Sequence, residues 1–148
     1  MNGVPLFLAD EAPDVPRMLR DDDLPLAIRQ VTRLCSDALQ DHGVFDLALY
    51  RRSEDSSSLR RWCSENRANF LWLVELLIWL MDESDRRFGV VGRGGVRWRR
   101  QRKIAQVCVE MAVWIPAGEM TAPPQVMPPD FRGPNTVEAH RAYYEAMQ

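Results

Sequence analysis

The most regular pattern of hydrophobic and polar positions runs from Leu59 to Gly89. Apolar residues recur there at helical spacing, at Trp62, Cys63, Phe70, Leu73, Leu77 and Leu80. Between Phe70 and Met81 the chain is apolar on almost every side, which is typical of a helix buried at the centre of a domain. This run is too short to cross a bilayer, which takes about 20 residues. The pattern therefore predicts a central buried helix over about 59–88, with Gly89 at its C-terminal cap.

Further helices are predicted on both sides of this central element. The acidic run Asp21–Asp23 is suited to start a helix, because carboxylates accept free backbone N–H groups and favour the positive end of the helix dipole. Its apolar face is formed by Leu24, Ile28, Val31, Leu34, Cys35 and Leu39, and His42 and Gly43 end it. A third helix is predicted over 97–114, and a last one over 137–147 after a cap at Asn135 and Thr136.

The remaining segments are predicted to be irregular. Six of the ten prolines lie between Pro116 and Pro134, which predicts an extended strap wrapped on the core. Residues 4–9 suit a short strand or an extended lead-in, residues 44–50 have no clear type, and the serine-rich 51–58 is expected to be a loop. The elements together predict an all-α bundle in one domain, 1–148, packed around Trp72 and Trp79.

Charge is distributed unevenly along the chain. The net charge is −2, yet residues 10–23 carry six acids, whereas residues 86–103 carry eight bases and no acid. Lys103 is the only lysine among the 19 basic residues. An excess of arginine favours bidentate contacts with phosphate or carboxylate groups, although a GC-rich coding sequence explains it equally well.

The segment from Val90 to Lys103 combines glycines with arginines. Gly92, Gly94 and Gly95 would suit a phosphate-binding loop, but no Lys-Ser/Thr pair follows them, so they do not form a P-loop motif. Arginines around a tryptophan are also suited to hold a nucleic-acid backbone and to stack on a base. The alternative is a flexible basic loop that leads into a surface helix.

Three carboxylates of the central helix are candidate site residues. Glu75 interrupts the apolar run, and a carboxylate in an apolar face is costly unless it is paired. Glu75 is therefore expected either to pair with an arginine, such as Arg29 or Arg87, or to be a site carboxylate with a raised pKa. Asp82 lies two helical turns further on, roughly aligned with Glu75, and Glu83 follows it.

The cysteines and histidines suggest no metal or catalytic site. Cys35, Cys63 and Cys108 are widely spaced among apolar residues, without zinc-binding spacing, and their odd number argues against a disulfide framework. They are interpreted as small core residues. No motif for a metal, a cofactor or nucleophilic catalysis is present, and no signal peptide or membrane-spanning run is recognised. The expectation is a cytoplasmic protein that uses no metal or cofactor, of unspecified oligomeric state, with no membrane partner.

Two blocks of sequence resemble a helical family of phage and bacterial proteins. The central block W-C-S-E-N-R-A-N-F-L-W-L-V-E-L is similar to the family's W-x-x-E-S-x-x-N-Y-x-W-L-x-E-L. Within this block the matching positions are Trp62, Glu65, Asn69, Trp72, Leu73, Glu75 and Leu76. The matches continue beyond it, in L-I-W-L-M-D-E-S-D-R-R-F-G, at Leu80, Glu83, Arg87 and Gly89. The C-terminal block T-A-P-P-Q-V-M-P is similar to T-P-x-P-Q-A-M-P, and its matches extend to Arg141, Tyr143 and Tyr144.

Members of this family are labelled pyrimidine-dimer DNA glycosylases of the endonuclease V type. The resemblance implies a helical enzyme that excises a damaged base with an amine nucleophile at the chain start and a carboxylate on the first helix. Arg29 and Arg33 match the arginines that flank this carboxylate, whereas Gln30 occupies its position. Asp23 and Gly92 stand where the family has histidines. Because an amide cannot act as a carboxylate base, the resemblance implies DNA binding and leaves excision open.

Three interpretations follow from these observations. In the first, a DNA- or nucleobase-directed protein places Gln30 at a base-sized pocket and binds phosphates through Arg29, Arg33, Arg87, Arg97, Arg99, Arg100 and Arg102. In the second, an enzyme acts on a free nucleotide or modified base, and Glu75, Asp82 and Glu83 supply acid–base groups or hold Mg²⁺. The third is a non-catalytic phage or mobile-element protein that uses the strap and the basic loop as contact surfaces. The first is the working prediction.

Overall fold

The structure is a computed structural model that describes residues 3–148, and its fold is all-α. The helices are α1 (Asp23–Asp41), α2 (Ser58–Glu65), α3 (Arg67–Phe88), α4 (Arg99–Met111) and α5 (Thr136–Ala146). A two-residue hairpin, β1 (Val91–Gly92) and β2 (Gly95–Val96), joins α3 to α4, with Val91 opposite Val96. The glycine-rich segment is therefore a hairpin turn.

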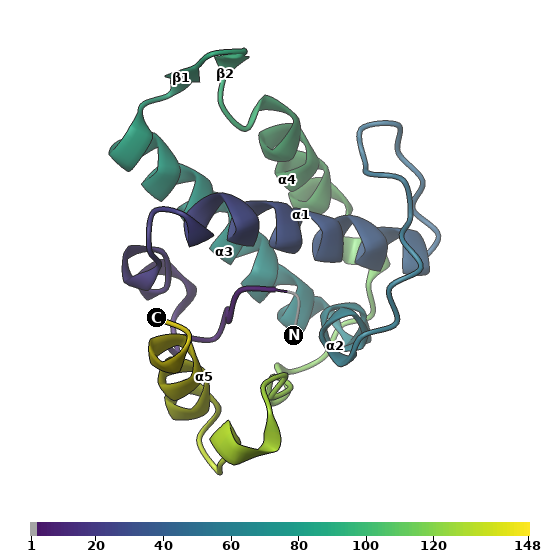
Figure 1. The fold of residues 1–148 in the computed structure, drawn as a ribbon. Helices are drawn as coiled ribbons and strands as arrows, with labels where there is room; N and C mark the ends of the chain where they lie inside the picture. The colour runs from purple at the N-terminus through teal and green to yellow at the C-terminus, as the bar shows by residue number, and fades with distance from the viewer. Residues whose placement is uncertain (1–2) are drawn as a thin grey trace.

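One hydrophobic core lies where α1 crosses α3 and α4 (Figure 1). The apolar faces predicted from helical spacing are buried there, with Leu24, Ile28 and Leu39 of α1 and Leu73, Leu77 and Leu80 of α3 fully inaccessible to water. Their spacing of three and four residues places them on one side of each helix, where they pack against each other. No helix in the described part of the chain is both long and apolar enough to cross a bilayer.

The predicted single helix over 59–88 is wrong, because the structure has two helices, α2 and α3, separated at Asn66. Asn66 has extended backbone angles (φ −156°, ψ 168°) and caps α3 by accepting a 2.9 Å hydrogen bond from the amide of Asn69. Its side-chain Nδ2 donates to the carbonyl of Glu119 in the strap, and the amide of Arg67 donates to the carbonyl of Pro116. Asparagine favours caps because its side chain replaces a helical backbone partner. The other end agrees with the prediction, since Gly89 (φ 88°) follows α3 as its cap.

The tryptophans of α3 do not form the centre of the core. Trp79 is 43% exposed, which contradicts its predicted burial. Trp72 is half-buried and stacks on Phe7 with ring centroids 5.1 Å apart, while its indole N–H donates to the carbonyl of Asp10. Phe70 is fully buried instead. The apolar run is thus buried on one side only.

Both ends of the described chain pack onto the helices without forming strands. Residues 4–9 are buried and irregular, and they continue into the short 3-10 helices η1 (Ala12–Asp14) and η2 (Pro16–Met18). Another such turn, η3 (Ala112–Trp114), follows α4. The strap after it is extended apart from η4 (Pro129–Phe131), as predicted, and α5 then lies beside the N-terminal segment (Figure 1). Arg141 of α5 donates a 2.6 Å hydrogen bond to the carbonyl of Leu8.

Candidate nucleic-acid interface

Two arginines from different helices converge on the ring of Tyr50. The guanidinium carbon of Arg33 (α1) lies 5.3 Å from the ring centroid, and that of Arg100 (α4) lies 4.6 Å from it. The phenol oxygen accepts a 2.7 Å hydrogen bond from Gln101. Cations held at this distance over an aromatic ring are attracted by its quadrupole. The contact joins α1, α4 and the loop between α1 and α2.

The backbone of Tyr50 is fixed by α1. Its amide donates to the hydroxyl of Ser36 at 3.0 Å, and its carbonyl accepts a 2.7 Å hydrogen bond from Gln40. Both side chains are buried, so these bonds are shielded from water. The ring is therefore held in place beside the two arginines.

A second contact of the same kind lies one helical turn back along α1. The guanidinium of Arg29 lies 5.5 Å from the ring of Trp98, whose indole N–H donates to the hydroxyl of Ser84. Trp98 has left-handed backbone angles (φ 60°), which cost an L-residue about 1–2 kcal/mol. We call the surface made by Arg29, Arg33, Arg100, Tyr50 and Trp98 the arginine face.

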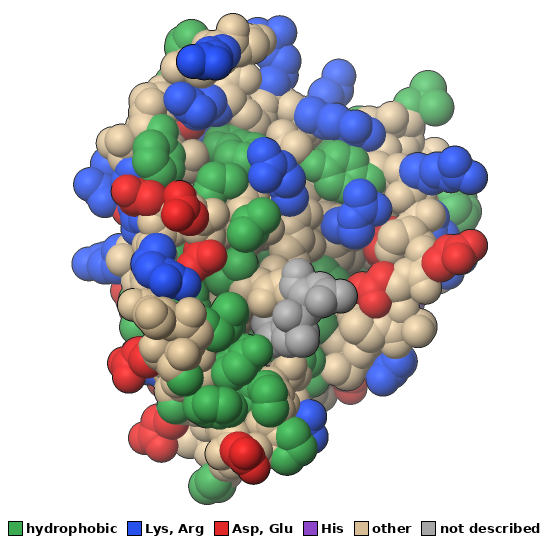
Figure 2. All heavy atoms as spheres, viewed as in Figure 1, with side chains coloured by type: hydrophobic (Ala, Val, Ile, Leu, Met, Phe, Trp, Pro, Cys, Tyr) green, Lys and Arg blue, Asp and Glu red, His purple; other side chains and the backbone are tan. Residues whose placement is uncertain are grey.

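The arginine face is electropositive for two reasons. Arg29, Arg33 and Arg100 form no ion pair with any carboxylate among residues 3–148. α4 also begins here without a side-chain cap and without an acid in its first turn, and Arg99 and Arg100 occupy that turn. Cations at the positive end of a helix dipole repel it, so this arrangement concentrates positive potential. Figure 2 shows basic side chains spread over the upper part of this view, around the hairpin, α4 and α1.

The remaining predicted arginines differ in their surroundings. Arg87 is 13% exposed and bonds to Glu83, Asp21 and the carbonyls of Leu19 and Pro16. Arg102 pairs with both Asp82 and Asp85. Arg97 is half-buried and lies against Gly92, and Arg99 is exposed next to the arginine face. Arg87 and Arg102 thus stabilise the folded chain, and carboxylates in contact with them already neutralise their positive charge.

The three predicted carboxylates do not form a common site. Glu75 is exposed and has no ion pair among the described residues. It is therefore neither paired with an arginine nor a carboxylate buried among apolar residues, as the sequence had suggested. Asp82 pairs with Arg102. Hydrogen bonds from Arg86 and Arg87 lower the pKa of Glu83 to about 2, although burial by itself would raise it. Among residues 3–148, no group of three or more His, Cys, Asp or Glu side chains is arranged to hold a metal ion.

Gln30 lines a cavity of about 470 Å³ between α1, the start of α2 and the strap. Its amide is already occupied, because Oε1 accepts a 2.8 Å hydrogen bond from the amide of Val4 and Nε2 donates to the Val4 carbonyl at 3.3 Å. A methyl group on Gly3 would lie 2.6 Å from Oε1, so the chain passes Gln30 closely. Gln30 thus holds the N-terminal segment against α1 through two hydrogen bonds to Val4. The amine at the chain start, which the resemblance implies as nucleophile, lies outside the described residues.

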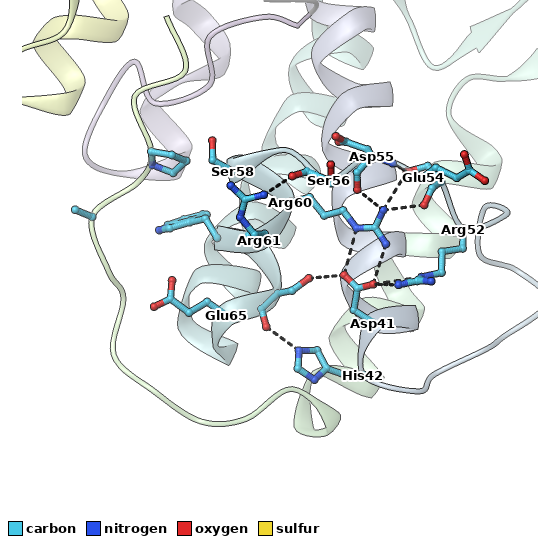
Figure 3. Close-up of a pocket in the computed structure, with 15 residues that line it drawn as sticks. Asp41, His42, Arg52, Glu54, Asp55, Ser56, Ser58, Arg60, Arg61 and Glu65 are labelled. Carbon is cyan, nitrogen blue, oxygen red and sulfur yellow. Dashed lines mark hydrogen bonds and ion pairs between the residues drawn. The ribbon is translucent and has the colours of Figure 1, made fainter.

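A larger depression of about 850 Å³ surrounds the start of α2 (Figure 3). Arg60 points from α2 to Asp41 at the end of α1, and Arg52 approaches the same carboxylate from the loop. Burial alone would raise the pKa of Asp41, but hydrogen bonds from Arg60, Arg52 and Ser64 lower it to about 2. Asp41, Arg52 and Arg60 therefore form a paired cluster, which holds the 51–57 loop against the helices.

Several residues on which the resemblance of the sequence was based hold irregular segments in place. Thr121 of the strap donates its amide to Asn69 and its hydroxyl to Glu65, and its carbonyl accepts from the indole of Trp62. Tyr144 donates a 2.7 Å hydrogen bond to Asp23. These matches therefore describe how the chain is held together.

The three cysteines are free and buried, as the sequence predicted. Burial raises the pKa of the Cys35 thiol, and the neighbouring thiols of Cys108 and Cys63 add to this effect. A thiol that stays protonated is a poor nucleophile, so Cys35 gives no support to thiol catalysis.

Comparison with known proteins finds no matching family profile, curated protein or solved structure. The arginine face is therefore assessed on its geometry alone. Sequence reasoning selected Arg29, Arg33 and Arg100 but missed Tyr50. Its position at the end of an apolar stretch and before Arg51 and Arg52 is the only signal that the sequence offers.

Proposed function

We propose that the protein binds the phosphate backbone of a nucleic acid through the arginine face. The observation that carries the proposal is the convergence of Arg29, Arg33 and Arg100, from two helices, on a surface without a neutralising carboxylate. Guanidinium groups bind phosphate oxygens in a planar, bidentate manner. Their contacts with Tyr50 and Trp98 reduce the conformational entropy that binding would otherwise cost.

The proposal does not include base excision as an established step. Gln30 is an amide that pairs with the backbone of Val4, so it offers no carboxylate for base excision. Excision, if it occurs, needs another group. The free-nucleotide interpretation is weaker, because Glu75, Asp82 and Glu83 do not converge on the 470 Å³ cavity that Gln30 lines.

Fluorescence anisotropy with a labelled DNA duplex tests the proposal, using intact DNA and DNA with a thymine dimer or an abasic site. We expect binding that weakens steeply between about 50 and 200 mM salt, because each bound phosphate releases counterions. The triple variant Arg29→Ala/Arg33→Ala/Arg100→Ala should bind at least about tenfold more weakly and should reduce the salt slope by about one unit per lost contact. Strand cleavage is followed in the same samples.

A matched control removes the same charge elsewhere. Arg17, Arg61 and Arg132 are exposed and lie outside the arginine face, so their triple alanine variant should keep most of the affinity. Equal losses in both triple variants would show that only net charge matters. A flat salt response, or no binding, would overturn the proposal and would favour a protein or nucleotide partner.

A further inference from the structure

The loop between α1 and α2 exposes two large apolar side chains near the arginine face. Phe45 is 74% exposed and Leu47 is 102% exposed, whereas Val44 and Ala48 pack against the core and Leu49 is buried. Single apolar residues are common on protein surfaces. Here two of them project outward at a spacing of two residues, from a segment whose other apolar side chains are used in packing.

This loop is held in place by hydrogen bonds. The side chain of Asp46 accepts a 2.8 Å bond from the amide of Ala48, and its carbonyl accepts from the amide of Leu49. The amide of Val44 donates to Leu39 at the end of α1. Because these hydrogen bonds fix the backbone within the turn and on both sides of it, Phe45 and Leu47 point outward from a backbone of defined conformation.

The turn is adjacent to the arginine face. Leu47 is three residues from Tyr50, which limits their separation to roughly 10 Å even for an extended chain. Tyr50 in turn lies under Arg33 and Arg100. Figure 1 shows the loop rising beside α4. Exposed apolar side chains therefore border a surface that attracts anions.

We propose that Phe45 and Leu47 form a wedge that inserts between base pairs of a duplex whose phosphates lie on the arginine face. Proteins that bend DNA use this combination, in which apolar side chains partly unstack a base step while basic residues hold the backbone. The inference rests on the proposed function, since the arginine face has to hold the duplex first.

A duplex fits these features better than a single strand. Single-strand binders stack successive bases on several open aromatic rings, whereas guanidinium groups already lie over the rings of Tyr50 and Trp98, which leaves Phe45 as the open ring beside this face. An anionic bilayer fits less well, because Asp46 lies between the two apolar residues and would be carried into the membrane surface with them.

Duplexes that carry 2-aminopurine at successive positions test the wedge, because this base brightens when it is unstacked. Wild-type protein should raise the fluorescence at one step of the bound duplex. The variant Phe45→Ala/Leu47→Ala should abolish this rise and bind about tenfold more weakly, a limited loss because unstacking offsets part of the apolar gain. Trp114→Ala, which removes an exposed apolar side chain beyond the far end of α4, is the control and should keep the signal.

The outcomes separate the two proposals. No binding by wild-type protein would overturn the proposed function itself. Binding that depends on Arg29 and Arg33 without a fluorescence rise, or with a rise that survives Phe45→Ala/Leu47→Ala, would overturn the wedge alone. The protein could instead fail to unstack DNA and sediment with phosphatidylglycerol vesicles only when Phe45 and Leu47 are present. That result would assign the loop to a lipid surface. Equal melting temperatures of the variants confirm that the fold is intact.

Discussion

The guanidinium of Arg60 lies 2.8 Å from the carboxylate of Asp41, and the Arg60 side chain is buried whereas that of Asp41 is 20% exposed. Arg60 also lies 3.7 Å from Asp37, which is 1% exposed, and donates to the carbonyl of Ser53. Breaking a buried ion pair leaves an uncompensated charge, so Arg60→Ala should lower the free energy of unfolding by about 3–5 kcal/mol. Urea denaturation measures this. Arg61→Ala, the exposed neighbour, should cost under about 1 kcal/mol, and similar losses in both variants would contradict the assignment.

Acid should unfold the protein through Asp41 and Glu83. Their pKa values are about 2 in the folded protein, below the ordinary values of 3.8 and 4.5. The unfolded chain therefore binds more protons, so the stability from these groups is complete above about pH 5 and is lost as the pH falls toward 2. Urea midpoints across this range measure the loss. Asp41→Asn and Glu83→Gln should each flatten the profile, and an unchanged profile would refute the role of that carboxylate.

His140 adds a second pH dependence, with a different window. Its side chain is 1% exposed and packs edge-on against Phe7, and neither ring nitrogen has a well-formed hydrogen bond within residues 3–148. Burial lowers the pKa of His140, and the backbone of Pro124 offsets only part of that shift. The unfolded state therefore takes up the proton first, and the stability from neutral His140 is lost as the pH falls below about 6.5.

The free energy of unfolding should thus decrease between about pH 7.5 and pH 5.5. The variant His140→Leu keeps an apolar side chain against Phe7 and removes the titrating group, so its stability should change less over this range. If the variant and the wild type lose stability in parallel, the pH dependence does not come from His140.

Asn66 should stabilise both the start of α3 and the strap. Asn66→Ala removes the cap of α3 and the hydrogen bond to Glu119, so we expect a loss of about 1–2 kcal/mol. Hydrogen exchange should also become faster around residues 116–121. Asn135→Ala, which removes the cap of α5, should cost a similar amount without this local change. Equal protection of the strap in wild type and Asn66→Ala would show that the cap and the strap are independent.

The helical framework was predictable because apolar spacing reports burial directly. The limits of α1 and α5 and the irregular strap agree with the pattern, since capping residues and prolines mark them locally. The break at Asn66 was missed because its cause is the distant strap, whose carbonyls at Pro116 and Glu119 complete the turn. Trp79 was wrongly predicted to be buried, because a helix can carry apolar residues on every side and still bury only one of its sides.

The candidate site was predictable only in part, and for a similar reason. The family resemblance selected Arg29 and Arg33, and the arginine-rich segment selected Arg100. Neither signal could separate these residues from Arg87 and Arg102, which are neutralised by carboxylates. Whether a charge is free depends on which helices meet. The carboxylates Asp82 and Glu83 were candidates for chemistry in the sequence, and their partners on α3 and α4 make them structural instead.

The hydrogen bond from Arg141 to Leu8 joins positions 133 residues apart. During synthesis on a ribosome, residues 4–9 emerge before α1 to α4, and α5, which contacts this segment through Arg141 and His140, emerges after them. The helices α1 to α4 form mostly from nearby sequence, so they are free to assemble early. The apolar N-terminal segment has to wait for α5 before Phe7 gains its final neighbours. The packing of this segment is therefore completed only after residues 136–146 have been synthesised, and a chain that stops before residue 136 leaves the segment without α5.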